Sequence, residues 1–220
     1  MFFSPLILSL LSSSLLLPAN IYGLSASSGS FGSPYYQNET LGATRSRELV
    51  EAYAMLGVPR ENVLALEADG MRDGMRERWR RETVVEEVSK AIAGTETWPR
   101  TFDYIVTFDR GGVSGHANHR SVAAAADAVG ARLGGGRVLR LTSLPLWSKY
   151  GGLPYALLRR LKSIASPSTS SRGCSFALSS PWEYRRAAKA MQAHASQLVW
   201  FRYGWWALSS YVFGAELCEM

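Results

Sequence analysis

The stretch Tyr104–Arg120, YIVTFDRGGVSGHANHR, decides the fold that the remaining sequence has to support. It opens with a short aromatic and β-branched run, which is typical of a buried strand. A glycine-rich turn follows, and His116 and His119 then open an alanine-rich helix that runs to about Ala131. Open α/β sheets place their ligands just beyond the carboxyl ends of strands, where such a turn lies. We therefore predict an α/β fold with its functional site in this turn.

The two histidines are the first candidates for chemistry. His116 and His119 are three residues apart near a helix start, so both can point into one cleft. Imidazole is a common zinc ligand and the side chain best suited to proton transfer near neutral pH. Asp109 is close enough in sequence to orient one of them through its second ring nitrogen. A pair with this spacing is most often a surface feature of a helix, but the chain has only three histidines and two follow a strand and a glycine turn.

Several segments resemble, in the same order, a known family. The central stretch, continued as TFDRGGVSGHANHRSV, is similar to the signature of the zinc-dependent de-N-acetylases of the LmbE-like family. Within that family it most resembles the branch that acts on N-acetylglucosaminyl-phosphatidylinositol (GlcNAc-PI) in GPI-anchor biosynthesis. Other matching segments are Leu41–Leu49 (LGATRSREL), Leu56–Val63 (LGVPRENV), the region of Asp73 and Gly74, and Ala190–Arg202 (AMQAHASQLVWFR). The resemblance therefore covers nearly the whole chain.

The resemblance implies both a fold and a reaction. The fold is a Rossmann-like, three-layer α/β sandwich with a mostly parallel sheet, built as one domain over residues 1–220. The reaction is zinc-dependent amide hydrolysis, in which His119 would bind Zn²⁺. His116, in its protonated form, would stabilise the tetrahedral oxyanion and donate a proton to the leaving amine.

Three further residues match positions on the substrate side of the family's site: Arg45, Asp73 and His194. The residues themselves leave an alternative open for each. Arg45 lies three residues before Glu48 and can form an exposed ion pair with it. Asp73 can form a turn beside Gly74. His194 can be a surface or packed histidine of a helix.

One family motif, His-Pro-Asp-Asp-Glu, has no counterpart in this sequence. In the family it follows the first strand and supplies a histidine and an aspartate to zinc and a second aspartate as general base. The sequence begins Met-Phe-Phe-Ser-Pro, which resembles the segment directly after that motif. We therefore expect the first strand to be missing, and the other zinc ligands and the base with it. The chain as written is then inactive, or its gene model lacks a 5′ exon.

The composition limits which kinds of function are possible. A chain of 220 residues with 47% hydrophobic residues can bury a sizeable core. The net charge of +6 suits anionic lipid, a phosphorylated substrate or nucleic acid. No nucleic-acid motif accompanies it, and over residues 76–82 the arginines are mixed with acids, as on a solvated helix face. Cys174 and Cys218 lack metal-type spacing, and we predict two free thiols in a reducing compartment.

Patterning predicts the other elements. Strands are expected at 20–24, 63–66, 137–144 and, at a sheet edge, 174–178; helices are expected at 42–57, 82–93, 153–164 and 182–201. Residues 1–18 are apolar and uncharged, and a buried core helix, a signal peptide and a transmembrane helix compete there. The buried helix is favoured because the run is short and serine-rich and lacks a basic start. The aromatic tail at 200–220 suits either a membrane–water interface or packing against the domain.

These observations predict hydrolysis of the N-acetyl group of GlcNAc-PI at the cytosolic face of the endoplasmic reticulum membrane. The membrane surface is an expected partner, and nucleic acid is not. One alternative is an inactive relic that binds glycolipid or a partner, and another is a deacetylase of a soluble N-acetylglucosaminide. A third is a secreted or anchored protein with a true signal sequence, in which the sequon at Asn38 would be glycosylated.

Overall fold

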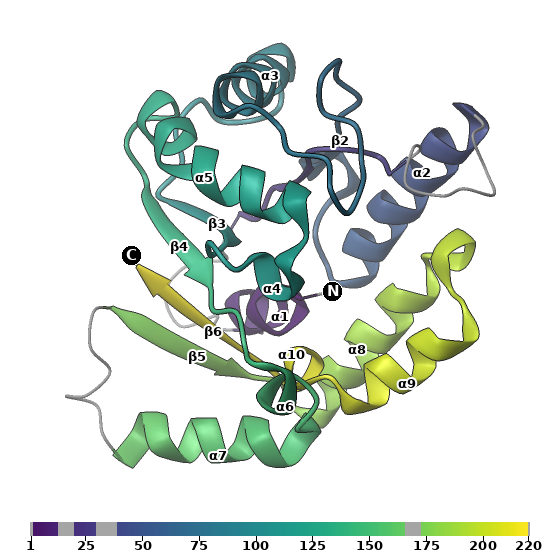
Figure 1. Ribbon diagram of the computed structural model, residues 1–220, viewed down its shortest axis with the longest axis vertical. Coiled ribbons are helices and arrows are strands. Elements are labelled where there is room, and N and C mark those ends of the chain that lie inside the picture. Colours follow the sequence, from purple (N-terminus) through teal and green to yellow (C-terminus); the bar gives the residue numbers. More distant parts are fainter. Residues whose placement is uncertain (1, 13–19, 30–38, 166–172, 220) are drawn as a thin grey trace.

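The computed structural model describes residues 2–12, 20–29, 39–165 and 173–219 (Figure 1). In the first half the elements are α1 (Ser4–Ser12), β1 (Gly23–Ser25), α2 (Glu39–Met55), the 3-10 helix η1 (Arg60–Asn62), β2 (Val63–Ala65), α3 (Arg81–Gly94), β3 (Tyr104–Phe108), α4 (Gly112–Gly115) and α5 (Ala117–Arg132). In the second half they are β4 (Arg137–Leu141), α6 (Leu146–Lys149), α7 (Gly152–Ala165), β5 (Cys174–Leu178), α8 (Pro181–Gln192), the 3-10 helix η2 (Ala195–Gln197), α9 (Trp200–Leu208), α10 (Ser210–Phe213) and β6 (Gly214–Glu219).

The described strands form two small sheets rather than one mostly parallel sheet. Strands β1 and β2 pair in parallel, and a second sheet has the order β3-β4-β6-β5. In that sheet β3 and β4 are parallel, whereas β6 runs antiparallel to both of its neighbours. The predicted α/β class is therefore confirmed, but the prediction of a mostly parallel sheet is wrong. The reason is β6, which enters the sheet from the end of the chain and in the opposite direction.

Strand β6 was not predicted, because the sequence analysis assigned residues 200–220 to an aromatic tail. Its sequence, GAELCE, contains two glutamates and a glycine, which are depleted in strands. In the structure β6 has the burial pattern of an inner strand, with Ala215, Leu217 and Cys218 buried and Glu216 only half-buried, so its burial does not alternate strictly along the chain. Cys174–Leu178 forms the edge strand that was predicted there.

The two cysteines form a disulfide, so the prediction of free thiols is wrong. Cys174 on β5 lies directly opposite Cys218 on β6, and the two sulfurs are bonded. The residues are 44 positions apart in sequence. Their proximity depends on the register between β5 and the unpredicted β6, so the spacing of the cysteines gave no sign of it.

The apolar N-terminal run forms a buried helix over its described part, as predicted. In α1, Ile7 and Leu8 are only 6% and 2% exposed and share a core with residues of α2 and α8. Residues 13–18, the rest of the run, lie outside the described residues, as does Asn38. No helix in the described ranges is long and apolar enough to cross a membrane.

The long helix predicted at 182–201 is broken in the structure. Helix α8 starts with a capping box, in which the Ser180 hydroxyl accepts from the Glu183 amide while the Glu183 carboxylate accepts from the Ser180 amide. The helix ends at Gln192, and the chain turns through η2 before α9 starts at Trp200. His194 lies in this break, with φ −82° and ψ 52°. The break turns α9 across the molecule toward the loops that carry the candidate site (Figure 1).

Helix α5 places the histidines at the end of β3. It packs on β3 and β4 and against α3. Its alanines allow this close approach: Ala125 is fully buried and lies in one core with Val129 and residues of α3. Because α5 begins directly after the turn that follows β3, its first residues lie at the carboxyl edge of the sheet, where the sequence predicted the site.

Candidate active site

The turn after β3 is tightly held and locally strained. Val113 has φ 65° and ψ −41°, and it is the only described non-glycine residue with positive φ. A β-branched residue disfavours this conformation strongly. Val113 is nevertheless buried, and its amide donates a 2.8 Å hydrogen bond to the Ser143 hydroxyl. The surrounding contacts therefore fix a backbone shape that a free chain would avoid.

Asp109 is the residue that fixes this turn. Its Oδ1 accepts from the amides of Gly111 (3.0 Å) and Gly112 (3.1 Å) and from the Ser143 hydroxyl. Its Oδ2 accepts from the Ser143 amide at 2.7 Å. One carboxylate thus joins the β3 turn to the segment that follows β4. A carboxylate that accepts several charge-assisted bonds gives a rigid connection.

The turn holds the ring of His119 in position. Its Nδ1 lies 3.0 Å from the carbonyl oxygen of Gly112, and its ring stacks on Phe108 with centroids 4.0 Å apart. Asp109 therefore acts on His119 through the Gly112 backbone, and the direct bond to the ring that the sequence suggested is replaced by this carbonyl. Gly112 itself has φ 59°, and a Cβ there would lie 3.1 Å from the Cβ of His119. A side chain there would crowd the histidine and would need a positive φ that glycine adopts without strain.

The two predicted histidines lie together. The rings of His116 and His119 are stacked with centroids 4.8 Å apart. The Nδ1 atom of His116 is buried and has no hydrogen-bond partner in the described part of the chain. Burial lowers the pKa of His119, and His116 acts in the same direction, while the Gly112 carbonyl and the charge of Asp73 oppose them. His119 is therefore neutral near pH 7, with Nδ1 bonded and Nε2 directed elsewhere.

The loop that carries Asp73 is tied to the histidine helix. Asn118, the residue before His119, accepts from the Gly74 amide at 3.1 Å and donates to the Arg72 carbonyl at 3.1 Å. These bonds bring Asp73 close enough for its charge to act on His119. Sequence reasoning missed Asn118, because its role depends on contacts with the distant Asp73 loop.

Arg45 and Asp73, both predicted to face substrate, are brought together beside Gly29. The Arg45 guanidinium donates to the Gly29 carbonyl. A Cβ placed on Gly29 would lie 2.9 Å from Arg45 Nη1 and 3.5 Å from Asp73 Oδ2. Glu48 does not take the alternative role as partner of Arg45: its carboxylate accepts from the amide and hydroxyl of Ser196 at 2.7 and 2.6 Å.

His194 lines a separate small cavity. The cavity has a volume of about 120 Å³ and is lined by Met191, His194, Gln197, Leu198 and Arg202. Burial lowers the pKa of His194 to about 4, so its ring is neutral near pH 7. Its Nδ1 is buried without a partner among the described residues. Neutral imidazole with an unsatisfied nitrogen can bond a hydroxyl group.

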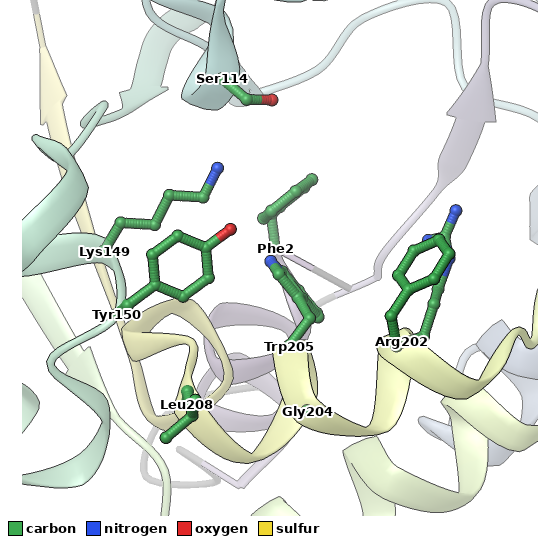
Figure 2. A pocket seen from close by; sticks show the side chains of 9 residues that line it. Phe2, Ser114, Lys149, Tyr150, Arg202, Gly204, Trp205 and Leu208 are labelled. Atoms are coloured by element: carbon green, nitrogen blue, oxygen red, sulfur yellow. The ribbon is translucent and has the colours of Figure 1, made fainter.

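The larger cavity lies beside the histidine turn. Its volume is about 470 Å³, and it is lined by Phe2, Ser114, Lys149, Tyr150, Phe201, Arg202, Gly204, Trp205 and Leu208. Figure 2 shows Ser114 of α4 facing Trp205 of α9 across this space, with Phe2 between them. The Phe2 ring makes edge contacts with His119, at 6.3 Å between centroids, and with Trp205, at 5.6 Å. Arg202 lines both cavities.

Comparison with known proteins decides the family. Residues 1–129 match the family model described as "PIG-L: GlcNAc-PI de-N-acetylase". The N-acetylglucosaminyl-phosphatidylinositol de-N-acetylase of Saccharomyces cerevisiae is 32% identical over 242 residues, covering 98% of this chain and 76% of the yeast protein. The enzyme of that name from Bos taurus is also 32% identical, over 96% of this chain and 75% of its own length. The chain belongs to the GlcNAc-PI de-N-acetylase family.

Solved structures confirm the LmbE-like deacetylase fold of this family member. The crystal structure of A40926 pseudoaglycone deacetylase Dbv21 superposes with a TM-score of 0.61 at 12% identity, covering 99% of this chain and 90% of that one. The zinc-inhibited form of teicoplanin deacetylase Orf2 gives a TM-score of 0.57 at 14% identity, covering 98% and 91%. At such identities the likeness concerns the fold alone.

The family's zinc can be tested against the side chains present. His119 suits a ligand, because its Nδ1 is held by a backbone carbonyl and burial keeps the ring neutral. A catalytic zinc site normally takes three protein ligands. Among the described residues no group of three or more histidine, cysteine, aspartate or glutamate side chains could hold a metal ion. These residues therefore supply one prepared ligand and do not form a zinc site by themselves.

Proposed function

We propose that this chain is a deacetylase of GlcNAc-PI, acting on the N-acetyl group of the sugar. Family membership over 98% of the chain is the observation that carries the proposal. A second observation supports the proposal. His116 and His119, which match the family signature, lie together beside a cavity. The products would be glucosaminyl-phosphatidylinositol and acetate.

The proposal gives each histidine a separate task. His119 would be one ligand to a zinc ion, and the metal would supply polarisation of the acetyl carbonyl and activation of water. His116 holds the proton that passes to the leaving amine, and it stabilises the oxyanion before that transfer. The strained turn and Asp109 keep the pair in one orientation, which preorganises the site.

Three residues are proposed to bind the sugar and its neighbours. Arg45 and Asp73 lie beside one another at Gly29, so a donor and an acceptor face the same region. His194 is neutral near pH 7 and would bond a hydroxyl rather than carry charge. Such paired polar contacts discriminate against analogues that lack the matching hydroxyl.

The test is direct turnover by this chain, combined with metal analysis. Purified protein is incubated with GlcNAc-PI and Zn²⁺, and released acetate and the free-amine lipid are measured by mass spectrometry. We expect H116A to abolish turnover without loss of the fold. Replacing GlcNAc-PI by a soluble N-acetylglucosaminide tests the related alternative of a soluble substrate.

One observation favours a second candidate function, glycolipid binding without chemistry. The described side chains provide one prepared zinc ligand and not three. Protein that binds GlcNAc-PI but neither retains zinc nor releases acetate would support this candidate. Stoichiometric zinc together with turnover would refute it.

We also propose that the chain works at the endoplasmic reticulum membrane, in keeping with its relatives' lipid substrate. The cytosolic face was expected from the family resemblance. The disulfide between Cys174 and Cys218 is unusual for a reducing compartment. Protease protection of microsomes and glycosylation at Asn38 test the orientation: a cytosolic domain is digested and stays unglycosylated.

A further inference from the structure

The larger cavity contains a buried lysine with no acidic partner. Lys149 is only 9% exposed, and Figure 2 shows its ammonium group pointing into the space below Ser114. The cavity lining includes two cationic side chains, Lys149 and Arg202, and no carboxylate. No ion pair involving Lys149 occurs in the described ranges of the chain. Burial lowers the pKa of Lys149, which is the response of an ammonium group that lacks a compensating anion.

The position of Lys149 is fixed by the fold. Its amide donates a 2.8 Å hydrogen bond to the Pro145 carbonyl, which closes the single turn of α6. The preceding carbonyl, of Ser148, accepts from the Ser210 hydroxyl at 2.6 Å. Tyr211 accepts from the Leu144 amide at 2.8 Å and so holds the segment that leads into α6. These bonds fix the backbone from which the Lys149 side chain enters the cavity.

The cavity lies beside the histidine turn, and helices that line it also carry exposed apolar side chains. Ser114 in its lining belongs to α4, and Phe2 contacts both His119 and the cavity residue Trp205. Helices α6 and α9 line the cavity and expose large apolar side chains. Trp147 is 89% exposed and Trp200 is 84% exposed. Tryptophans in such positions are typical of the headgroup region of a bilayer.

We propose that this cavity binds the phosphodiester group of a membrane phospholipid, with Lys149 as its counter-ion. The proposal rests on the proposed function, because GlcNAc-PI carries such a group between its sugar–inositol head and its lipid tail. Arg202, on the other side of Phe2 and Trp205, adds a second positive charge to the cavity lining (Figure 2). With the phosphate at Lys149, the sugar side faces the histidine turn and the acyl chains leave over the apolar side chains of α6 and α9. The Lys149 residue is largely buried, and a phosphate would supply the anion that the cavity lining lacks.

Binding can be measured separately from turnover. We would compare the wild-type chain with K149Q and with K162Q, which removes the same charge from an exposed site on α7. The probes are vesicles of phosphatidylcholine with and without phosphatidylinositol, soluble glycerophosphoinositol, and inorganic phosphate. Co-sedimentation serves for vesicles, and isothermal titration calorimetry serves for the soluble probes. Thermal melting of each variant, and of K149R, controls for folding.

We expect K149Q to weaken binding of phosphatidylinositol vesicles and of glycerophosphoinositol by about tenfold to hundredfold, as for a lost charge-assisted bond. K162Q should change both by less than about twofold, and K149R should retain most of the affinity. Equal effects of K149Q and K162Q would overturn the proposal. Inorganic phosphate that binds as tightly as glycerophosphoinositol would overturn the assignment to a lipid. Absence of turnover in every variant would count against the proposed function and leave the binding result intact.

Discussion

The carboxylate of Asp109 gives the sharpest test of how the site is held. In D109N one oxygen remains, and it can still accept the bonds now made to Oδ1. The amide nitrogen then faces the Ser143 amide, whose hydrogen bond to Oδ2 is 2.7 Å long. Two hydrogen-bond donors then face each other. If the side-chain amide rotates by 180°, its NH2 group faces the amides of Gly111 and Gly112 instead, and those bonds are lost. Every orientation of the new side chain therefore leaves at least one amide unpaired.

The cost follows from the lost bonds. A hydrogen bond to a charged acceptor contributes about 1.5–3 kcal/mol, and an unsatisfied buried donor costs a similar amount. We therefore expect D109N to lose about 3 kcal/mol of the free energy of unfolding. For a chain of this size that lowers the midpoint of thermal unfolding by roughly 6–12 °C. The matched control is D103N, because Asp103 is exposed at the other end of the same strand.

Turnover should fall as well, even at temperatures where the variant is still folded. At a temperature below the unfolding midpoints of both the wild type and D109N, the variant remains folded. The Gly112 carbonyl that holds His119 is then no longer fixed. We therefore expect turnover of GlcNAc-PI, measured at that temperature, to drop by at least tenfold, a loss of about 1.4 kcal/mol in transition-state stabilisation. If D109N melts and turns over like D103N, the carboxylate does not organise the turn and the reasoning fails.

Other consequences of the structure can be measured in parallel. Burial lowers the pKa of His194 to about 4, so between pH 6.5 and pH 4 the unfolded chain binds a proton that the folded chain does not bind. Stability should therefore fall by roughly 3 kcal/mol from pH 7 to pH 4, and urea unfolding of H194Q should show a smaller loss. Tyr211 bridges the Leu144 amide and the Thr142 carbonyl at 2.8 and 3.0 Å, so Y211F should cost about 2 kcal/mol by chemical denaturation, and an unchanged midpoint would contradict that bridge. The C174S variant, lacking the disulfide, should lose about 2–4 kcal/mol, and a reductant should lower the melting temperature of the wild type but not of the variant.

The local pattern of the central stretch was sufficient to predict its structure. A β-branched run, glycines and an alanine-rich helix specify β3, the turn and α5 through neighbouring residues alone, and the two histidines followed from that placement. The buried helix α1 was predicted for the same reason, since a short charge-free run has few other stable positions. These features depend on residues close in sequence.

The errors have the opposite origin, because each depends on residues far apart in sequence. Strand β6 forms by pairing between β4 and β5. The disulfide forms because the register of β5 and β6 places Cys174 opposite Cys218. The break at His194 likewise depends on Glu48, which caps the segment after it through Ser196. A helical pattern continues through residues 182–201 in the sequence, but tertiary contacts override it.

The candidate site follows the same division. His116 and His119 were predicted because chemistry restricts which side chains serve there. Asn118 and Lys149 were missed because neither residue type by itself indicates a site. Asn118 matters because it bonds the Asp73 loop. Lys149 matters because it lines a cavity that has no carboxylate in its lining. A lysine in sequence is usually a solvated charge, and burial alone makes this one informative. The sequence therefore points to candidates whose residue type is chemically distinctive, whereas the fold is needed to find residues, such as Asn118 and Lys149, whose importance comes from contacts with distant segments.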